Sequence, residues 1–161
     1  MTAFLSLGGN LGNTREIFEQ TYPLIEKKIG HILQKSSLYQ TAAWGMTEQA
    51  DFLNQVIAVD TQLDPEAILT QLLAIEQVFG RVREVKWGPR NIDLDLLLVG
   101  NTQVNTSQLQ VPHPRMQDRK FILIPLAEIA SDIVHPVLGQ PINVLLAQTA
   151  DTSTVTLIQN L

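Results

Sequence analysis

Cysteine is absent from the 161-residue chain, which excludes disulfides, thiolate metal sites and cysteine nucleophiles. No apolar run is long enough to span a membrane as a helix. The first residues, MTAFLSLGG, lack the basic start and the long apolar stretch of a secretory signal. From these absences we expect a cytoplasmic protein that does not associate with membranes.

Positive charge is also scarce, since 11 lysine and arginine residues stand against 16 acidic ones, for a formal net charge of -5. A general nucleic-acid binder needs a broad positive field, so we expect no nucleic-acid partner, although a small basic pocket remains compatible with this balance. Hydrophobic residues make up 45% of the chain, as in globular proteins. The length suits one domain, residues 1–161, with a sizeable core, and we expect a monomer.

The order of predicted elements is β-α-β-β-α-β over roughly the first hundred residues. Apolar and alternating stretches predict strands, and apolar residues at helical spacing predict two helices. We expect Thr14 to cap the first helix and Gly30 to close it. The second helix should begin at Asp64-Pro65 and end at Gly80. The predicted strands are Ala3–Leu7, Ile32–Tyr39, Phe52–Thr61 and Ile92–Val99, and the predicted long loops are Gln40–Asp51 and Arg81–Arg90.

This order is typical of a ferredoxin-like α+β sandwich, in which two helices cover one face of a four-stranded antiparallel sheet. We also expect a short additional hairpin. From Asn101 onward we expect a proline-flanked loop at His113 and C-terminal helical pieces at Arg119–Ala130 and Ile142–Thr149. These pieces are too short to fold alone, so we predict that they decorate the same domain.

Two acids interrupt the otherwise apolar strand in WGPRNIDLDLLLVG. Asp93 and Asp95 are two residues apart, so they point to the same side of the strand with Cα atoms ~6.5 Å apart. Burying two unpaired carboxylates costs several kcal/mol, and Mg²⁺ held by carboxylates and substrate phosphates would compensate for that cost. The alternative, at about even odds on spacing alone, is that both acids are solvated or paired with arginines.

The basic loop that precedes the acids favours the metal hypothesis. GRVREVKWGPR carries four cations against one acid, a local charge of +3 in an acidic chain, and the guanidinium fork fits phosphate oxygens. Cations beside a two-carboxylate metal site suit a polyphosphate. The alternative is a solvated loop whose arginines pair with the two acids. The four cations are Arg81, Arg83, Lys86 and Arg90, and the acid is Glu84.

Four further residues carry weaker signals. Glu76 lies at the edge of the apolar stripe of its helix, where it could hold a phosphate-binding arginine or be an ordinary surface acid. Phe52 and Asn54 share a strand face that could stack on and hydrogen-bond a flat heterocycle, although core packing alone would explain Phe52. A lone loop histidine such as His113 is more often structural than functional.

Six short strings are spread over nearly the whole chain: LSLGGNLG, FLNQVIAV, IEQVFGRVR, WGPRNIDLDLLL, VPHPRM and DRKFILIPLAEIA. Through these strings, which follow the family's order, the chain resembles the 6-hydroxymethyl-7,8-dihydropterin pyrophosphokinase family of the folate pathway. The resemblance implies the ferredoxin-like fold and transfer of the pyrophosphoryl group of ATP to the pterin hydroxymethyl group, with release of AMP.

The resemblance also implies a role for individual residues. Asp93 and Asp95 would hold two Mg²⁺ ions, and Arg81 and Arg90 would act on the phosphates during catalysis. The residues expected at the ATP are Glu76, Arg83, Lys86, Trp87, His113 and Arg119. The residues expected at the pterin are Thr41, Ala43, Trp44, Gly45, Phe52, Asn54 and Phe121.

The sequence departs from the family pattern at three places. Thr41 is followed by two alanines where the family usually has two prolines, which loosens a rigid wall on the pterin side. Phe52 stands where tyrosine is frequent, which keeps the ring and drops a hydroxyl. Lys86 stands where some members have arginine, so a compact ammonium group replaces a planar guanidinium that can bind two oxygens at once. None of these departures removes an expected metal ligand.

Three other hypotheses compete with this one. The chain could be another metal-dependent phosphotransfer enzyme on the same fold, such as a nucleotide cyclase or a phosphodiesterase. It could be a non-catalytic binding module, because ferredoxin-like domains often bind RNA or small regulators. It could also be a family member that binds but does not turn over, against which the intact acid pair argues.

Overall fold

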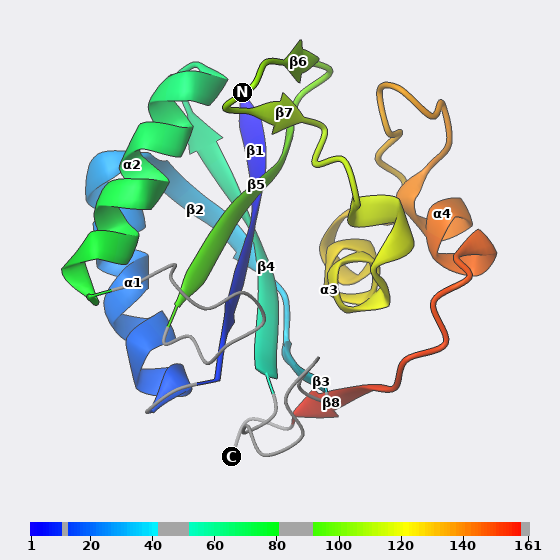
Figure 1. The fold of residues 1–161 in the computed structure, drawn as a ribbon, viewed down its shortest axis with the longest axis horizontal. Coiled ribbons are helices and arrows are strands. Elements are labelled where there is room, and N and C mark those ends of the chain that lie inside the picture. Colours follow the sequence, from blue (N-terminus) through cyan, green and yellow to red (C-terminus); the bar gives the residue numbers. More distant parts are fainter. Residues whose placement is uncertain (11–12, 42–51, 81–91, 159–161) are drawn as a thin grey trace.

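A single antiparallel sheet with helices on both sides forms the body of the protein (Figure 1). The computed structural model describes residues 1–10, 13–41, 52–80 and 92–158. The strands are β1 (Thr2–Gly9), β2 (Gly30–Lys35), β3 (Leu38–Thr41), β4 (Phe52–Thr61), β5 (Asp93–Val99), β6 (Val104–Asn105), β7 (Gln110–Val111) and β8 (Val155–Ile158). The helices are α1 (Thr14–Lys28), α2 (Pro65–Val78), the short 3-10 helix η1 (Met116–Asp118), α3 (Lys120–Ala130) and α4 (Ile142–Gln148).

The strand order confirms the predicted ferredoxin-like fold. The sheet runs β5-β1-β4-β3-β8, and β2 pairs with β4 next to β3. Thus β2 and β3 together take the place of the one strand predicted at Ile32–Tyr39. The expected extra hairpin is also present, as β6 paired with β7. The strand β8 at the sheet edge was not predicted.

Helix ends follow the predictions at α2 and depart from them at α1. Asp64 caps α2 through its side chain, which accepts a hydrogen bond from the backbone N–H of Ala67, and Gly80 follows with a φ of 68°. The side chain that caps α1 is Asn13, not Thr14. Gly30 opens β2 instead of closing α1, and a Cβ there would lie 2.0 Å from the carbonyl oxygen of Asp60. The glycine therefore permits close strand contact rather than a left-handed helix end.

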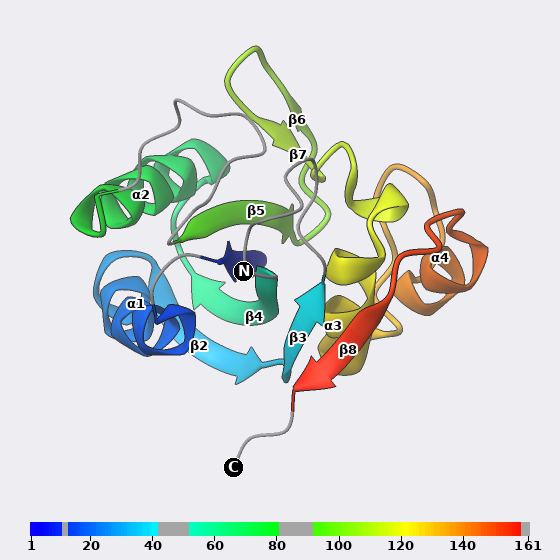
Figure 2. The same ribbon diagram turned by 60° about the horizontal axis from the view of Figure 1, so that its bottom comes forward.

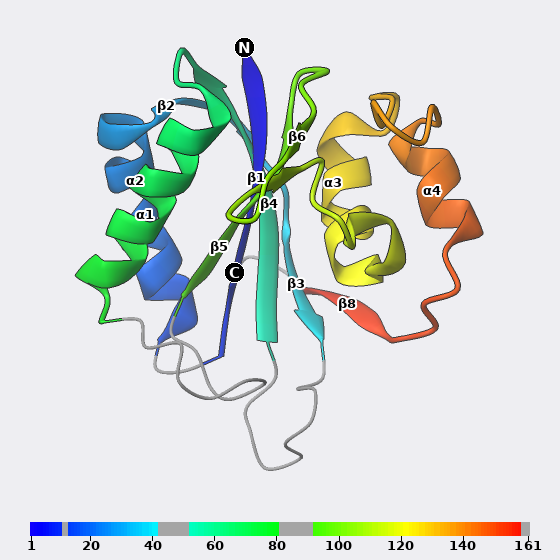
Figure 3. The same ribbon diagram turned by 45° about the horizontal axis from the view of Figure 1, so that its top comes forward.

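Two separate cores form on the two faces of the sheet (Figure 3). On one face, α1 and α2 pack through Phe18, Ile25 and Leu72 against β1, β4 and β5. On the other face, α3 and α4 pack through Leu126 and Ile142, among others, against the same strands. The C-terminal helices thus take part in a second core with the sheet, which is more than the decoration predicted from their length.

The predicted loop Arg81–Arg90 lies outside the described residues. So does the predicted loop Gln40–Asp51, apart from Gln40 and Thr41, which belong to β3. None of the helices in the described part of the chain has the length and apolar character needed to cross a membrane.

Candidate active site

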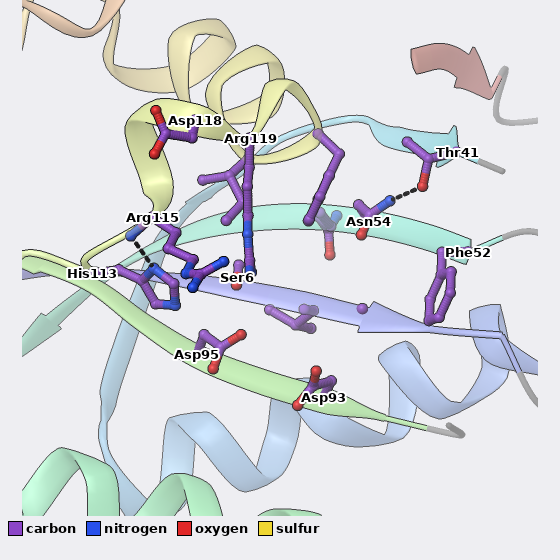
Figure 4. A pocket seen from close by; sticks show the side chains of 15 residues that line it. Ser6, Thr41, Phe52, Asn54, Asp93, Asp95, His113, Arg115, Asp118 and Arg119 are labelled. Carbon is purple, nitrogen blue, oxygen red and sulfur yellow. Dashed lines mark hydrogen bonds between the residues drawn. The ribbon is translucent and has the colours of Figure 1, made fainter. Parts of the chain in front are cut away.

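The acid pair of β5 faces the side of the sheet that carries α3. Leu94 and Leu96 alternate with the acids and are buried in the core under α1 and α2. Asp93 and Asp95 are only partly buried and point into an open pocket on the opposite face (Figure 4). The period of two along the strand therefore separates the apolar side chains from the charged ones.

The neighbouring strand β1 leaves room beside the acids. Asp95 lies opposite Ser6, and Asp93 lies opposite Gly8 in the antiparallel register. A Cβ at Gly8 would sit 3.4 Å from the side-chain oxygen of Asn54, so any larger side chain would fill the floor of the pocket. The pocket has a volume of about 500 Å³, large enough for a small-molecule substrate.

Eight of the residues predicted from the sequence line this one pocket. They come from β3, β4, β5, the segment before η1, and the start of α3, which are far apart in the chain. These residues are Thr41, Phe52, Asn54, Asp93, Asp95, His113, Arg119 and Phe121.

One end of the pocket combines aromatic and amide groups. Asn54 is 8% exposed and its side-chain nitrogen donates a 3.1 Å hydrogen bond to Oγ1 of Thr41 (Figure 4). Thr41 in turn lies opposite Phe52 across the β3–β4 pair. The bond fixes the plane of the amide, so that a ring stacked on Phe52 would meet a pre-oriented polar group.

The other wall carries positive charge and a neutral histidine. The guanidinium carbon of Arg119 lies 5.8 Å from the centre of the Phe121 ring, a distance typical of cation–π contacts. Burial first, and then the charge of Arg119, lower the pKa of His113 to about 4, although the charge of Asp93 acts to raise it. His113 is therefore uncharged at neutral pH.

The tautomer of His113 follows from its hydrogen bonds. Its Nδ1 accepts a 3.2 Å bond from the backbone N–H of Arg115, so the neutral ring carries its proton on Nε2. The backbone N–H of His113 donates to the carbonyl of Leu97 at 2.9 Å, which ties this segment to β5. A neutral donor is thus held beside the acid pair.

Glu76 lies behind the acidic strand. Its side chain is 2% exposed, and its Oε2 accepts a 2.8 Å hydrogen bond from the backbone N–H of Leu94. Leu94 is the residue between Asp93 and Asp95. A helix side chain thereby anchors the strand at the point from which both acids project, a placement that periodicity along α2 did not reveal.

Replacing Glu76 with alanine should lower the free energy of unfolding by about 2–3 kcal/mol, because the buried N–H of Leu94 loses its acceptor. Glu76→Gln keeps an acceptor oxygen and should cost less than about half of that. Urea denaturation measures both values. The matched control is Gln77→Ala, which alters the exposed neighbour on the same helix and should change stability by less than about 0.5 kcal/mol. Equal losses for Glu76→Ala and Glu76→Gln would contradict this role.

The lowered pKa of His113 predicts a pH-dependent stability. Between its ordinary value of 6.5 and the folded value of about 4, the unfolded chain binds more protons than the folded one. Stability should therefore be full above pH 6.5 and fall as the pH drops toward 4, by on the order of 2 kcal/mol from this group. Urea titrations in metal-free buffer at several pH values, on the parent and on His113→Gln, isolate this contribution. Parallel curves for the two proteins would contradict it.

Eight predicted site residues lie outside the described residues. These are Ala43, Trp44, Gly45, Arg81, Arg83, Lys86, Trp87 and Arg90. Conversely, the pocket is lined by four polar residues that sequence reasoning missed: Ser6, Gln55, Arg115 and Asp118. Arg115 and Asp118 belong to the quoted motifs VPHPRM and DRKFILIPLAEIA, so the sequence could have indicated them as site residues. Ser6 could be found only through the pairing of β1 with β5.

The candidate metal ligands predicted from the sequence are the two carboxylates of the acid pair, Asp93 and Asp95. No group of three or more histidine, aspartate or glutamate side chains gathers within the described ranges. Two partly exposed carboxylates on one strand face suit a cation that takes its remaining ligands from water and substrate phosphates, as Mg²⁺ does. A zinc centre would need three or four protein ligands, which these ranges do not supply.

The fold and the pocket together describe a class of protein. A ferredoxin-like sheet places two carboxylates, a neutral imidazole and an arginine at one end of a pocket, and an aromatic–amide pair at the other. That division fits a transferase that joins a charged phosphate donor to a flat acceptor.

Comparison with known proteins identifies the family. Residues 4–131 match the family model described as 7,8-dihydro-6-hydroxymethylpterin-pyrophosphokinase. A 2-amino-4-hydroxy-6-hydroxymethyldihydropteridine pyrophosphokinase of Synechocystis is 41% identical over 152 residues, which are 94% of this chain and 77% of the relative. A protein of the same name in Bacillus subtilis is 42% identical over 132 residues, 81% of this chain and 79% of the relative. The chain belongs to the 7,8-dihydro-6-hydroxymethylpterin-pyrophosphokinase family.

Solved structures bear out the fold. A Plasmodium falciparum HPPK-DHPS wild-type structure with pteroate aligns over 91% of this chain with a TM-score of 0.73 and 18% identity. An HPPK-DHPS structure in complex with substrates aligns with the same TM-score at 17% identity. The chain spans only about two fifths of those longer chains, 42% in both cases.

Proposed function

We propose that this protein transfers the pyrophosphoryl group of ATP to the hydroxymethyl group of 6-hydroxymethyl-7,8-dihydropterin and releases AMP. One observation carries the proposal in addition to family membership. The acid pair of β5 and the aromatic–amide pair of β4 open into the same pocket, so a phosphate donor and a flat acceptor can be held in contact.

Asp93 and Asp95 would hold two Mg²⁺ ions. The bound ions would neutralise phosphate charge and lower the pKa of the attacking hydroxyl. The carboxylates suit this role because they share one strand face and remain open to the pocket. Glu76 contributes by anchoring the backbone between them, and we propose that it also supports the ATP side of the site.

The pterin would lie between Phe52 and Phe121, which line the same pocket. Stacking on an aromatic side chain contributes ~1–3 kcal/mol per ring in single-stranded nucleic acid recognition, and a pterin presents a comparable flat face. Asn54, oriented by Thr41, would hydrogen-bond the pterin edge. We propose that Ala43, Trp44 and Gly45 complete this wall, on the strength of the sequence motif.

The nucleotide would lie toward His113 and Arg119. The Nε2–H of His113 can donate to a phosphate oxygen without adding charge, and Arg119 can supply a positive charge. We propose that the other residues expected at the ATP lie on this side of the pocket as well, and that Arg81 and Arg90 act on the transferred group. The residues proposed on motif grounds alone are Arg81, Arg83, Lys86, Trp87 and Arg90.

No side chain of the described pocket is required as a general base in this scheme. Catalysis would consist of positioning the hydroxymethyl oxygen in line with the β-phosphorus and of stabilising the charge that develops on the leaving AMP. Arginines, together with the Mg²⁺ ions that Asp93 and Asp95 would hold, would supply the second effect.

The decisive experiment measures AMP release from MgATP with and without 6-hydroxymethyl-7,8-dihydropterin. We expect AMP to appear only with the pterin, in equal amount to the pyrophosphorylated product. Release of ADP would indicate transfer of a single phosphoryl group. Pterin-independent loss of pyrophosphate would indicate a nucleotide cyclase on the same fold. Either outcome, or no turnover with bound substrates, would refute the proposal.

We further propose that residues 1–161 form one domain and that the protein is a monomer that works in the cytoplasm, where ATP is available, and has no nucleic-acid partner. Light scattering coupled to gel filtration tests the oligomeric state, and filter binding with RNA tests the last point. The formal charge of -5 supports the absence of a nucleic-acid partner.

A further inference from the structure

The C-terminal strap, which we define as residues 149–158, returns from α4 to the sheet edge. It lies beyond residues 4–131, the part matched by the family model. Figure 2 shows β8, its last part, alongside β3 with α3 next to both. The strap thus reaches two elements that carry pocket residues, although it contributes no lining residue to the pocket.

The first anchor of the strap is at the start of α3. The residue that precedes this helix, Arg119, makes no side-chain capping bond. Instead, Oδ2 of Asp151 accepts a 2.8 Å hydrogen bond from the backbone N–H of Lys120, from a distance of 31 residues. A carboxylate at this place satisfies an orphan N–H and complements the helix dipole. Lys120 is the residue between Arg119 and Phe121, which both line the pocket.

The second anchor is at the end of β3. Strand β8 pairs with β3 so that Val155 lies opposite Thr41, and Thr41 lies opposite Phe52 on β4. Val155, Thr41 and Phe52 therefore lie side by side on three neighbouring strands, at the aromatic end of the pocket. Thr41 is also the residue that accepts the hydrogen bond from Asn54.

Asp151 is itself held firmly in the strap. Its Oδ1 accepts hydrogen bonds from the backbone N–H and the hydroxyl of Ser153. Burial acts to raise the pKa of Asp151, but the bonds from Ser153 and Lys120 outweigh it and the pKa is lowered. The side chain is therefore a carboxylate at neutral pH and can serve as an acceptor on both sides.

The opposite ends of α3 and β3 are joined independently. Glu128 accepts hydrogen bonds from Ser37 at 2.9 Å and 3.0 Å and from the hydroxyl of Tyr39. Glu128 lies eight residues beyond Lys120, about 12 Å along the helix. This link fastens the end of α3 away from the pocket, whereas Asp151 bonds to the end at the pocket.

We propose that Asp151 is a positioning residue for the pterin subsite. It holds the first turn of α3, and with it Phe121 and Arg119, in a fixed position relative to Thr41 and Phe52. Strand β8, which follows Asp151 in the strap, pairs with β3 beside these two residues. This inference rests on the proposed function. Its physical content is preorganisation: a fixed helix start removes the ordering cost that substrate binding would otherwise bear.

The test compares substrate binding in full-length variants well below their unfolding temperatures. Asp151→Ala should raise the KM for the dihydropterin and the Kd for 6-hydroxymethylpterin, measured by calorimetry, about tenfold, with kcat changed by less than about threefold. Asp151→Asn keeps one acceptor oxygen, which can serve the Lys120 N–H, but turns an amide N–H2 toward the donors of Ser153. Its KM and Kd should therefore lie between those of the parent and of the alanine variant. Asp132→Ala removes an exposed carboxylate beyond the far end of α3 and should leave KM and Kd unchanged.

The outcomes separate positioning from mere stability. An Asp151→Ala protein with a lower unfolding temperature but the parent Kd would overturn the proposal, as would equal losses in Asp151→Ala and Asp151→Asn. If Asp151→Ala does not fold, Ser153→Ala takes its place; it removes one bond to Asp151 and should raise Kd about two- to threefold, and a parent Kd would overturn the proposal. Failure of the proposed function would appear differently, as absence of pterin binding in the unaltered protein.

Discussion

Asp95→Ala should abolish turnover, by at least about a thousandfold in kcat, because one of two carboxylates that would hold the metal ions is lost. The side chain projects into the pocket opposite Ser6 and takes no part in the two apolar cores. The fold should therefore stay largely intact, and the unfolding temperature of the apo protein should change little, while activity disappears.

The measurement is AMP release at saturating dihydropterin over a range of Mg²⁺ concentrations, paired with a thermal melt. Asp95→Asn preserves shape and should be nearly as inactive as alanine, since a neutral amide is a weaker ligand for a hard cation. Asp132→Ala serves as the charge-matched control and should retain parent activity. Near-normal turnover of Asp95→Ala at saturating Mg²⁺ would count against the metal site.

Arg90→Ala should cost on the order of 3 kcal/mol in the barrier, about 150-fold in rate, by analogy with the loss of one preorganised charge donor. Arg90 lies three positions before Asp93 in the motif WGPRNIDLDL and outside the described residues, so this prediction depends on the sequence pattern. Loss of the guanidinium should act mainly on the chemical step, because the phosphate charge that it faces grows in the transition state.

Single-turnover kinetics measures that step without product release. Arg90→Lys retains the charge but loses the planar fork and should fall between the parent and the alanine variant. Arg15→Ala, a cation at the start of α1 that takes no part in the proposed site, is the control. A single-turnover rate for Arg90→Ala within error of the parent would refute the role.

Local patterns were enough to predict most of the elements. The strand predicted at Phe52–Thr61, the Asp64-Pro65 start of α2 and Gly80 after the end of that helix all reappear in the structure. Such features depend on interactions between residues a few positions apart, which a sequence displays directly. Gly30 shows the limit, because its small size is required by Asp60, a residue 30 positions away.

The candidate site divides in the same way. The acid pair could be predicted because the period of two along one strand places Asp93 and Asp95 on one face. The backbone support that Glu76 gives to Leu94 could not, since it joins a helix to a strand 18 residues away. Ser6 likewise enters the pocket only through the register of β1 against β5.

By itself, the sequence determined the ferredoxin-like order of elements, the family motifs and the two acids on one strand face. Only the tertiary structure decided that the C-terminal helices form a second core, that His113 is neutral with its proton on Nε2, and that Asp151 caps α3 from a distance. The physical reason is the range of the forces involved. Propensity and periodicity act between near neighbours in the chain, whereas burial, pKa shifts and distant capping depend on which segments the fold brings together.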